Sequence, residues 1–202
     1  ENKKRITKDI VVYEDFISKE DCKKMIQALD AQAESGKLSW MPISFYESYS
    51  SVLPQDNDQE ILDADLSPTM FSDIENKMPE AIASVHDLDP KIISKIGYHT
   101  QKWEPGAYAR KHSDNTDENG KSGAFTRSRY AGFLYLNDDF EGGETNFPNL
   151  NIKVDPKKGK LVLWDNIKDD GSLDYDSLHA GLPVKSGYKY IAVIWIRENE
   201  FY

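Results

Sequence analysis

Hydrophobic residues follow two periodicities along this chain, helical spacing in the first part and alternation in the second. Residues 9–15, DIVVYED, predict a short strand. Ser18 precedes acidic residues, a pattern typical of a helix N-cap, and the helix is expected to end near Ala33. The apolar positions of this helix fall on one face and predict burial on that side: Cys22, Met25, Ile26 and Leu29.

A second helix is predicted where Pro68 follows a serine, because proline is favoured at the first position of a helix. Apolar residues continue at helical spacing to about Val85, and an interruption is expected near Pro79. Residues 36–64, between the two predicted helices, are polar and rich in turn-forming residues, and they predict no regular element.

From Ile92 onward, short apolar runs alternate with turn residues, which favours an antiparallel sandwich or jelly roll. We predict one α+β domain over residues 1–202, with a helical part at 1–90 and a double-stranded β-helix (jelly-roll) core at 91–202. The N-terminal helices are expected to pack on one sheet, and the core to enclose a pocket between its sheets. The predicted strands lie in KIGYHTQKW, AYARKHSD, RYAGFLYLN, LNIKV, GKLVLWD, SLHAG and KYIAVIWIR.

The charge and composition of the chain limit the kinds of binding partner and compartment that we expect. The formal net charge is −10, which disfavours general binding to nucleic acid. No apolar run approaches the roughly 20 residues that cross a bilayer, and the first ten residues do not resemble a signal peptide. The single cysteine, Cys22, excludes an intrachain disulfide. We expect no membrane partner, favour a soluble, cytoplasmic protein, and make no prediction of oligomeric state.

A candidate metal site is formed by two histidines and one aspartate. His112 and Asp114 are two residues apart, so in a regular strand both point to one face, together with Tyr108. His179 completes a set of two imidazoles and one carboxylate, the donors that hold Fe(II) with open coordination positions. A catalytic zinc site remains an alternative on ligand type. The remaining histidines, at 86 and 99, are interpreted as structural.

Lys189 begins the last apolar strand, ten residues after His179. A lysine at such a position either projects into solvent or, if buried, needs an anionic partner. A dicarboxylic acid that chelates a metal at its other end would supply that anion. A turn around Lys185–Gly187 is expected to lay the Lys189 strand beside the His179 strand, and alternation places Trp195 on the face of Lys189.

Several motifs together resemble the prolyl 4-hydroxylase branch of the 2-oxoglutarate/Fe(II)-dependent dioxygenases. SLHAGLPVKSGYKYIAVIWI is similar to the C-terminal signature of that branch, and YLNDDFEGGETNFP to its internal strand and turn. WEPGAYARKHSD resembles the strand with the H-x-D motif, GKLVLW the strand before the distal histidine, and KDIVVYEDFISKEDCKKMI the opening strand and helix. The resemblance is close over residues 99–197 and loose over 8–33.

This resemblance implies an enzyme that uses Fe(II), 2-oxoglutarate and O2, with ascorbate as a further candidate cofactor. It implies His112, Asp114 and His179 as catalytic iron ligands, and Lys189 as the partner of the distal carboxylate of 2-oxoglutarate. Tyr108 and Trp195 are the other candidate contacts with the co-substrate. A tyrosine of the family is replaced here by Trp103.

The resemblance further implies hydroxylation of prolyl residues in a peptide or protein, with release of succinate and CO2. Hydroxylation of a free amino acid or another small metabolite is the alternative, and a non-catalytic metal-binding module is a remote one. The polar segment 115–128 is a candidate substrate cover, and Arg110, Arg127 and Arg129 a candidate basic rim. The glycines at 142 and 143 are expected to form a tight turn.

Overall fold

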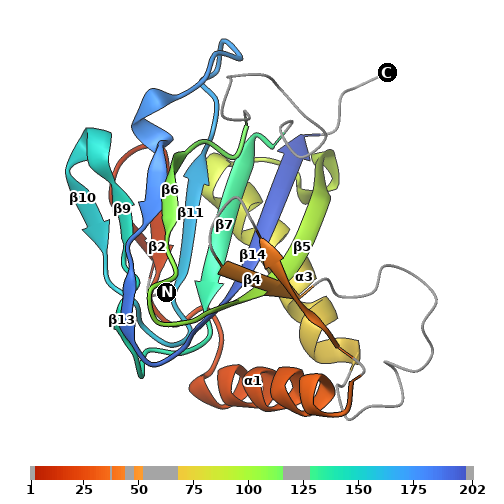
Figure 1. Ribbon diagram of the computed structural model, residues 1–202. Helices are drawn as coiled ribbons and strands as arrows, with labels where there is room; N and C mark the ends of the chain where they lie inside the picture. Colours follow the sequence, from red (N-terminus) through yellow and green to blue (C-terminus); the bar gives the residue numbers. More distant parts are fainter. Residues whose placement is uncertain (1–2, 37, 44–47, 52–67, 116–127, 199–202) are drawn as a thin grey trace.

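The structure, a computed structural model, describes residues 3–36, 38–43, 48–51, 68–115 and 128–198, and their elements form three layers (Figure 1). Two helices cover one face of a large sheet, and a smaller sheet faces its other side. Strands β1 to β7 span Lys3–Arg5, Ile10–Tyr13, Trp40–Ile43, Ser48–Ser51, Ile93–Trp103, Ala109–His112 and Tyr130–Tyr135. Strands β8 to β14 span Glu141–Gly142, Thr145–Phe147, Ile152–Val154, Leu161–Asp165, His179–Gly181, Val184–Ser186 and Lys189–Glu198.

The sheets have distinct strand orders. The major sheet has the order β1-β2-β11-β7-β14-β5-β4-β3, and the minor sheet the order β10-β9-β12-β6. A further pair, β13-β8, lies where the chain passes between the two sheets. All seven strands expected after residue 92 are present, whereas the short strands β8, β9 and β13 were not predicted. These strands are two or three residues long and lie beside predicted turns, so they carry too little alternation to be recognised.

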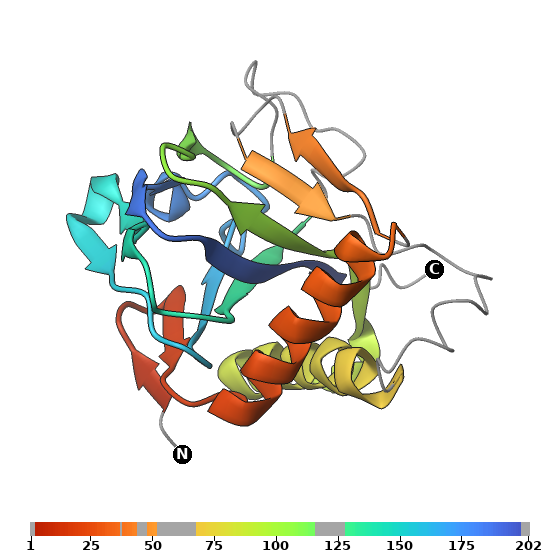
Figure 2. The same cartoon turned by 60° about the horizontal axis from the view of Figure 1, so that its bottom comes forward.

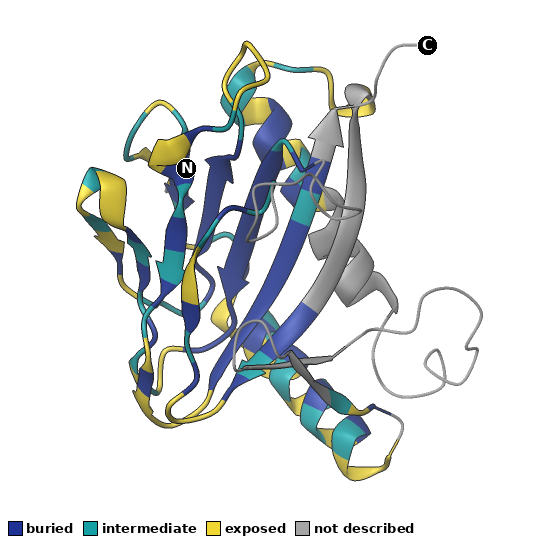
Figure 3. Cartoon of the chain, turned by 45° about the horizontal axis from the view of Figure 1, so that its top comes forward, coloured by how far each residue is buried: buried dark blue, intermediate teal, exposed yellow. Residues whose placement is uncertain are grey.

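At the centre of the major sheet, β7 and β11 are buried on both faces, and so are most described side chains of β14 (Figure 3). Successive side chains of a strand point to opposite sides, so each strand supplies two separate cores. In β7, Leu134 packs in the core under the helices, and Phe133 in the core between the sheets. In β14, Ile194 and Val193 divide in the same way.

Helices α1 (Lys19–Glu34) and α3 (Pro68–His86) lie together on the outer face of the major sheet (Figure 2). The side chain of Ser18 caps α1, as predicted, by accepting a hydrogen bond from the backbone N–H of Asp21. Cys22 is fully buried on the sheet-facing side, where burial raises the pKa of its thiol to about 12.

The expected interruption of α3 is wrong, because the helix continues through Pro79. Proline removes one intrahelical hydrogen bond. Met78 and Ile82 are almost fully buried against the sheet on either side of it, and this packing favours the continuous helix.

The first part of the chain is less helical than predicted. Strands β1 to β4 all belong to the major sheet, and β3 and β4 fall within residues 36–64, for which no element was expected. Among the described residues, no helix is long and apolar enough to cross a lipid bilayer.

Candidate active site

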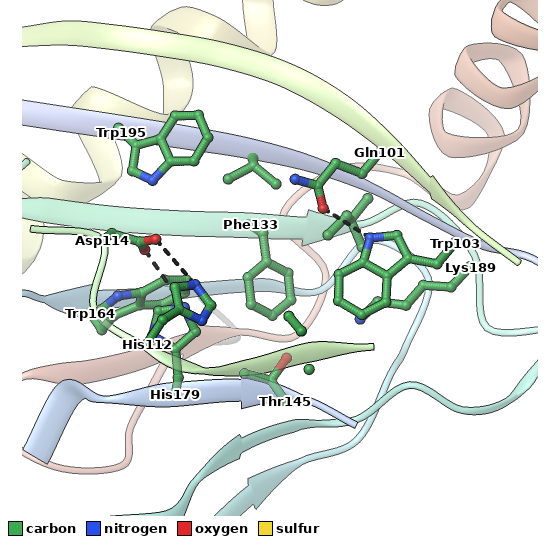
Figure 4. Close-up of a pocket in the computed structure, with 14 residues that line it drawn as sticks. Gln101, Trp103, His112, Asp114, Phe133, Thr145, Trp164, His179, Lys189 and Trp195 are labelled. Carbon is green, nitrogen blue, oxygen red and sulfur yellow. Dashed lines mark hydrogen bonds and ion pairs between the residues drawn. The ribbon is translucent and has the colours of Figure 1, made fainter. Parts of the chain in front are cut away.

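Two histidines and one aspartate converge in the minor sheet, at one end of a pocket between the sheets (Figure 4). His112 ends β6, and His179, the first residue of β12, pairs with it across the ladder. Nε2 of His112 lies 3.5 Å from one carboxylate oxygen of Asp114, and Nε2 of His179 lies 3.7 Å from the other. Donor atoms of all three side chains fall within 4.8 Å of one another.

Backbone carbonyls orient both imidazoles. Nδ1 of His112 is 2.6 Å from the carbonyl oxygen of Arg110, and Nδ1 of His179 is 3.1 Å from that of Ser177. A proton on each Nδ1 donates to these acceptors, so Nε2 is the nitrogen that faces Asp114 and is available to a metal ion. When Nδ1 forms such a hydrogen bond, it fixes the tautomer of a histidine that binds a metal through Nε2.

The protonation states of the two histidines and the aspartate favour the binding of a cation. Burial, aided by His112, lowers the pKa of His179 to about 4, so this imidazole is neutral near neutral pH. Burial favours a raised pKa for Asp114, but the histidines and a hydrogen bond from Trp195 outweigh it and hold the pKa below its usual value. Burial opposes charge on His112 as well, yet the hydrogen bond to Asp114 prevails and raises its pKa. A metal ion would displace that proton.

The donor set fits Fe(II). Two imidazole nitrogens and one carboxylate leave further coordination positions open to a co-substrate and O2. Among the described residues, no other group of three ligating side chains comes this close together. Cys22, which a closed thiolate zinc site would need, is buried under α1 on the opposite side of the major sheet.

The pocket extends from this cluster to Lys189 and encloses, with its mouth, about 490 Å³. Its walls are mainly aromatic and aliphatic side chains from the facing sheets. Apart from the three residues of the cluster, it is lined by Gln101, Trp103, Ala109, Phe133, Thr145, Trp164, Gly181, Lys189, Ile191, Val193 and Trp195.

Lys189 is buried, with 1% of its surface exposed. Its ammonium donates a hydrogen bond of 2.9 Å to the carbonyl of Gly143 and lies 4.0 Å from the ring centroid of Trp103. No carboxylate of the described residues forms an ion pair with it, and burial lowers its pKa to about 7. A buried ammonium without an ion-pair partner is costly, so this end of the pocket favours an anionic ligand.

Alternation along β14 brings Lys189 and Trp195 to the same pocket, as the sequence predicts. Ile191 and Val193 lie between them and line the same wall. Trp195 reaches the metal end, where its side chain forms a hydrogen bond with Asp114. One strand therefore contributes to both ends of the pocket.

The expected pairing of the His179 and Lys189 strands is wrong. β12 belongs to the minor sheet, between β6 and β9, and β14 to the major sheet, between β7 and β5. The intervening β13 pairs with β8 and carries the chain from one sheet to the other. His179 and Lys189 therefore approach the pocket from opposite walls, which leaves room for a ligand between them.

The prediction that alternation brings Tyr108 into the pocket is also wrong. Tyr108 precedes β6, and its neighbour Ala109 lines the pocket instead. His179 pairs with His112 but Gly181 pairs with Ala109, so β6 carries one extra residue between these pairs. Such a bulge reverses the faces on which the preceding side chains lie.

Most of the residues that form the pocket walls were not predicted as site residues, among them Gln101, Trp103 and Thr145. Thr145 begins the short strand β9 directly after the glycine turn, and so short a strand gives no usable periodicity. Trp103 carried a signal, since it replaces a tyrosine of the resembled family, but a strand aromatic is more often a core residue. The predicted turn is present, with φ of 77° at Gly142 and 67° at Gly143.

The candidate basic rim receives little support. Arg129 forms an ion pair of 3.4 Å with Asp169 and a hydrogen bond with the hydroxyl of Tyr130. Arg127 and most of the candidate cover, residues 116–127, lie outside the described residues. His86, interpreted as structural, lies 3.0 Å from the carboxylate of Asp165.

The sequence and the fold are similar to those of known proteins. Residues 98–197 match the family model of the 2OG-Fe(II) oxygenase superfamily. The chain is 40% identical over 75 residues to prolyl 4-hydroxylase subunit alpha-1 of Homo sapiens, covering 37% of this chain and 14% of that protein. It is 28% identical to prolyl 4-hydroxylase subunit alpha-2 of Gallus gallus, covering 95% and 35%. The chain spans less than half the length of these curated relatives.

Solved structures are similar over nearly the whole chain. The viral collagen prolyl hydroxylase vCPH of Paramecium Bursaria Chlorella virus-1, in a 2OG complex, is 27% identical with a TM-score of 0.67. The match covers 94% of this chain and 96% of that one. A prolyl hydroxylase of Trichoplax adhaerens, in complex with a peptide fragment of hypoxia inducible factor, has a TM-score of 0.65 at 14% identity. It covers 95% of this chain and 84% of that one, and at this identity only the fold is comparable.

Proposed function

Because residues 98–197 belong to the 2OG-Fe(II) oxygenase superfamily, we propose that this protein is an Fe(II)- and 2-oxoglutarate-dependent hydroxylase of prolyl residues in a peptide or protein. The observation that carries the proposal is one pocket with a two-histidine, one-carboxylate cluster at one end and a buried lysine at the other. A metal-chelating dicarboxylate satisfies both ends at once.

The side chains have separate roles in this proposal. His112, Asp114 and His179 hold Fe(II), and Lys189 pairs with the distal carboxylate of 2-oxoglutarate. Trp195 positions Asp114 through its hydrogen bond. The bound iron and co-substrate supply the oxidative chemistry, which consumes O2 and yields succinate and CO2. The apolar walls exclude water from that chemistry.

The proposal also includes the type of β-fold and the extent of the domain. We infer that the facing major and minor sheets form a double-stranded β-helix, and that residues 1–202 are one domain. The viral hydroxylase with a TM-score of 0.67 supports this, because its match extends over 94% of the chain.

A prolyl substrate is supported by the relatives, which are named as prolyl hydroxylases. The viral relative is named as a collagen prolyl hydroxylase, which favours a peptide or protein over a free amino acid. Ascorbate is proposed as an auxiliary reductant on family grounds alone. A non-catalytic module is disfavoured, because it would not need a buried lysine opposite a complete cluster.

The test is an anaerobic titration of the protein with Fe(II) and 2-oxoglutarate, followed by visible absorption. Wild type is expected to develop a metal-to-ligand charge-transfer band, and Lys189→Ala to require at least about tenfold more 2-oxoglutarate, because a buried ion pair is lost. Lys185→Ala, which removes an exposed lysine of β13, is the matched control and should behave as wild type. Bound iron without any band in wild type would overturn the 2-oxoglutarate assignment.

The substrate is tested by mass spectrometry with proline-containing peptides and with free proline under turnover conditions. A peptide that gains one oxygen atom, with matching release of succinate, supports the proposal. Oxidation of free proline alone would favour the small-metabolite alternative.

A further inference from the structure

The end of the pocket farthest from the histidines is formed by Trp103 and Lys189 (Figure 4). Trp103 ends β5 and lies directly opposite Lys189 in the ladder with β14. Cross-strand partners point to the same face of a sheet. The ammonium therefore lies 4.0 Å from the indole ring centroid, within the range of a cation–π interaction.

A hydrogen bond within β5 holds the indole of Trp103 in place. Its Nε1–H donates a hydrogen bond of 2.9 Å to the side-chain oxygen of Gln101, two residues earlier on the same face. This donor is thereby occupied within the protein, so Trp103 offers a ligand its ring and not a hydrogen bond. Trp103 is 4% exposed and Gln101 5%, so the pair forms part of the packed wall.

The far edge of the indole reaches the opposite sheet at Gly181. A Cβ added at Gly181 would lie 2.4 Å from Cη2 of Trp103 and 2.7 Å from Cζ3, far inside van der Waals contact. Gly181 does not have positive φ, so the glycine there provides room for the indole. The ring thus spans the pocket from β5 in the major sheet to β12 in the minor sheet.

We propose that Trp103 sets the length of the 2-oxo dicarboxylate that this pocket accepts. This inference rests on the proposed function. A ligand that chelates at the His112–His179 end and pairs with Lys189 at the other must match their separation. The indole fills the space beside the ammonium up to Gly181, so the lysine has little room to withdraw from a longer acid. The pocket therefore selects five-carbon 2-oxoglutarate over six-carbon 2-oxoadipate.

The test is calorimetric binding of both acids to protein loaded with Mn(II), which avoids turnover. One methylene in a fitted pocket is worth about 10- to 200-fold, so wild type should prefer 2-oxoglutarate by at least about tenfold. Trp103→Phe, which vacates the space at Gly181, should reduce that preference at least about fivefold, mainly through tighter 2-oxoadipate binding. Trp164→Phe, at the histidine end, is the matched control and should change both affinities alike.

Gly181→Ala gives a second test of opposite sign. The added methyl group pushes the indole toward Lys189, so the preference for the shorter acid should increase, and circular dichroism checks that the variant folds. An unchanged preference in folded Trp103→Phe or in folded Gly181→Ala would overturn the inference, as would an equal loss of preference in Trp164→Phe. A wild-type protein that binds neither acid would instead overturn the proposed function.

Discussion

Asp114 is the residue on which the electrostatics of the site depend most. Its carboxylate is buried, and it stays ionised only because two imidazoles and Trp195 compensate for the loss of water. Interactions of this kind around a metal ligand commonly change metal affinity by about 10- to 100-fold. Metal affinity is therefore expected to depend on Trp195, which is not itself a metal ligand.

Trp195→Phe keeps an aromatic side chain but removes the hydrogen bond to Asp114. We expect metal affinity to fall by about tenfold, because the carboxylate is less well fixed and less stabilised as an anion. Competition with a metal chelator of known affinity measures this loss. Trp164→Phe, whose indole nitrogen donates to Asn166, serves as the control for losing an indole. Unchanged affinity in Trp195→Phe would contradict the role assigned to the hydrogen bond.

Lys189 predicts a pH dependence of co-substrate binding. Burial lowers its pKa from 10.5 to about 7, so the free pocket loses its positive charge as the pH rises above about 7. The distal carboxylate binds the protonated form, so affinity for 2-oxoglutarate should fall with rising pH, approaching tenfold per pH unit at about pH 8 to 9. Calorimetry on Mn(II)-loaded protein measures the slope.

A 2-oxo acid without a second carboxylate, such as 2-oxobutanoate, is the control for this pH dependence. It chelates the metal in the same way but has no group to pair with Lys189, so its affinity should lack the additional slope. Equal slopes for the two acids would show that the lysine is not the titrating group.

At the scale of elements, short irregularities direct the side chains of the site. One extra residue in β6 sends Ala109 rather than Tyr108 into the pocket. The β13–β8 pair carries the chain between sheets, so β12 and β14 face each other instead of pairing. Helix α1, by contrast, starts at the cap residue that its sequence predicts.

Ser18→Ala tests the contribution of that cap. We expect a loss of about 1 kcal/mol in the free energy of unfolding, because the N–H of Asp21 loses its side-chain acceptor. Denaturant unfolding measures the change, and Ser186→Ala, an exposed serine in β13, is the control. Metal affinity should be unaffected, since α1 packs on the face of the major sheet away from the pocket. A loss of metal affinity would mean that the helix supports the site directly.

At the scale of the whole molecule, the site joins the two sheets, with the proposed metal ligands on the minor sheet and Lys189 and Trp195 on the major sheet. A ligand that contacts both sheets binds only the folded protein. Ligand binding should therefore raise the stability of the whole domain.

Metal together with 2-oxoglutarate is expected to raise the Tm of the wild type. At about 100 times the dissociation constant the gain is about 2.7 kcal/mol. For a chain of this size that corresponds to roughly 5 to 10 °C. Differential scanning calorimetry with Mn(II) measures it, and Asp114→Ala should show a much smaller shift. An equal shift in the variant would indicate that metal binds elsewhere.

Much of the site follows from local pattern. The H-x-D pair, His179 and Lys189 are recognisable by residue type and spacing, and alternation along β14 correctly joins Lys189 to Trp195. Gln101 and Thr145 could not be identified in this way. Their role as pocket walls depends on which sheet faces them, and this is not encoded within either strand.

The sequence by itself determined seven of the strands after residue 92, the capped helix and the face of β14 that lines the pocket. These depend on backbone geometry over a few residues, which local composition controls. Tertiary structure decided which strands face each other, where β6 bulges, and that Trp103 reaches Gly181. Such contacts join residues far apart in the chain, and their distances depend on how two sheets pack, which no local periodicity specifies.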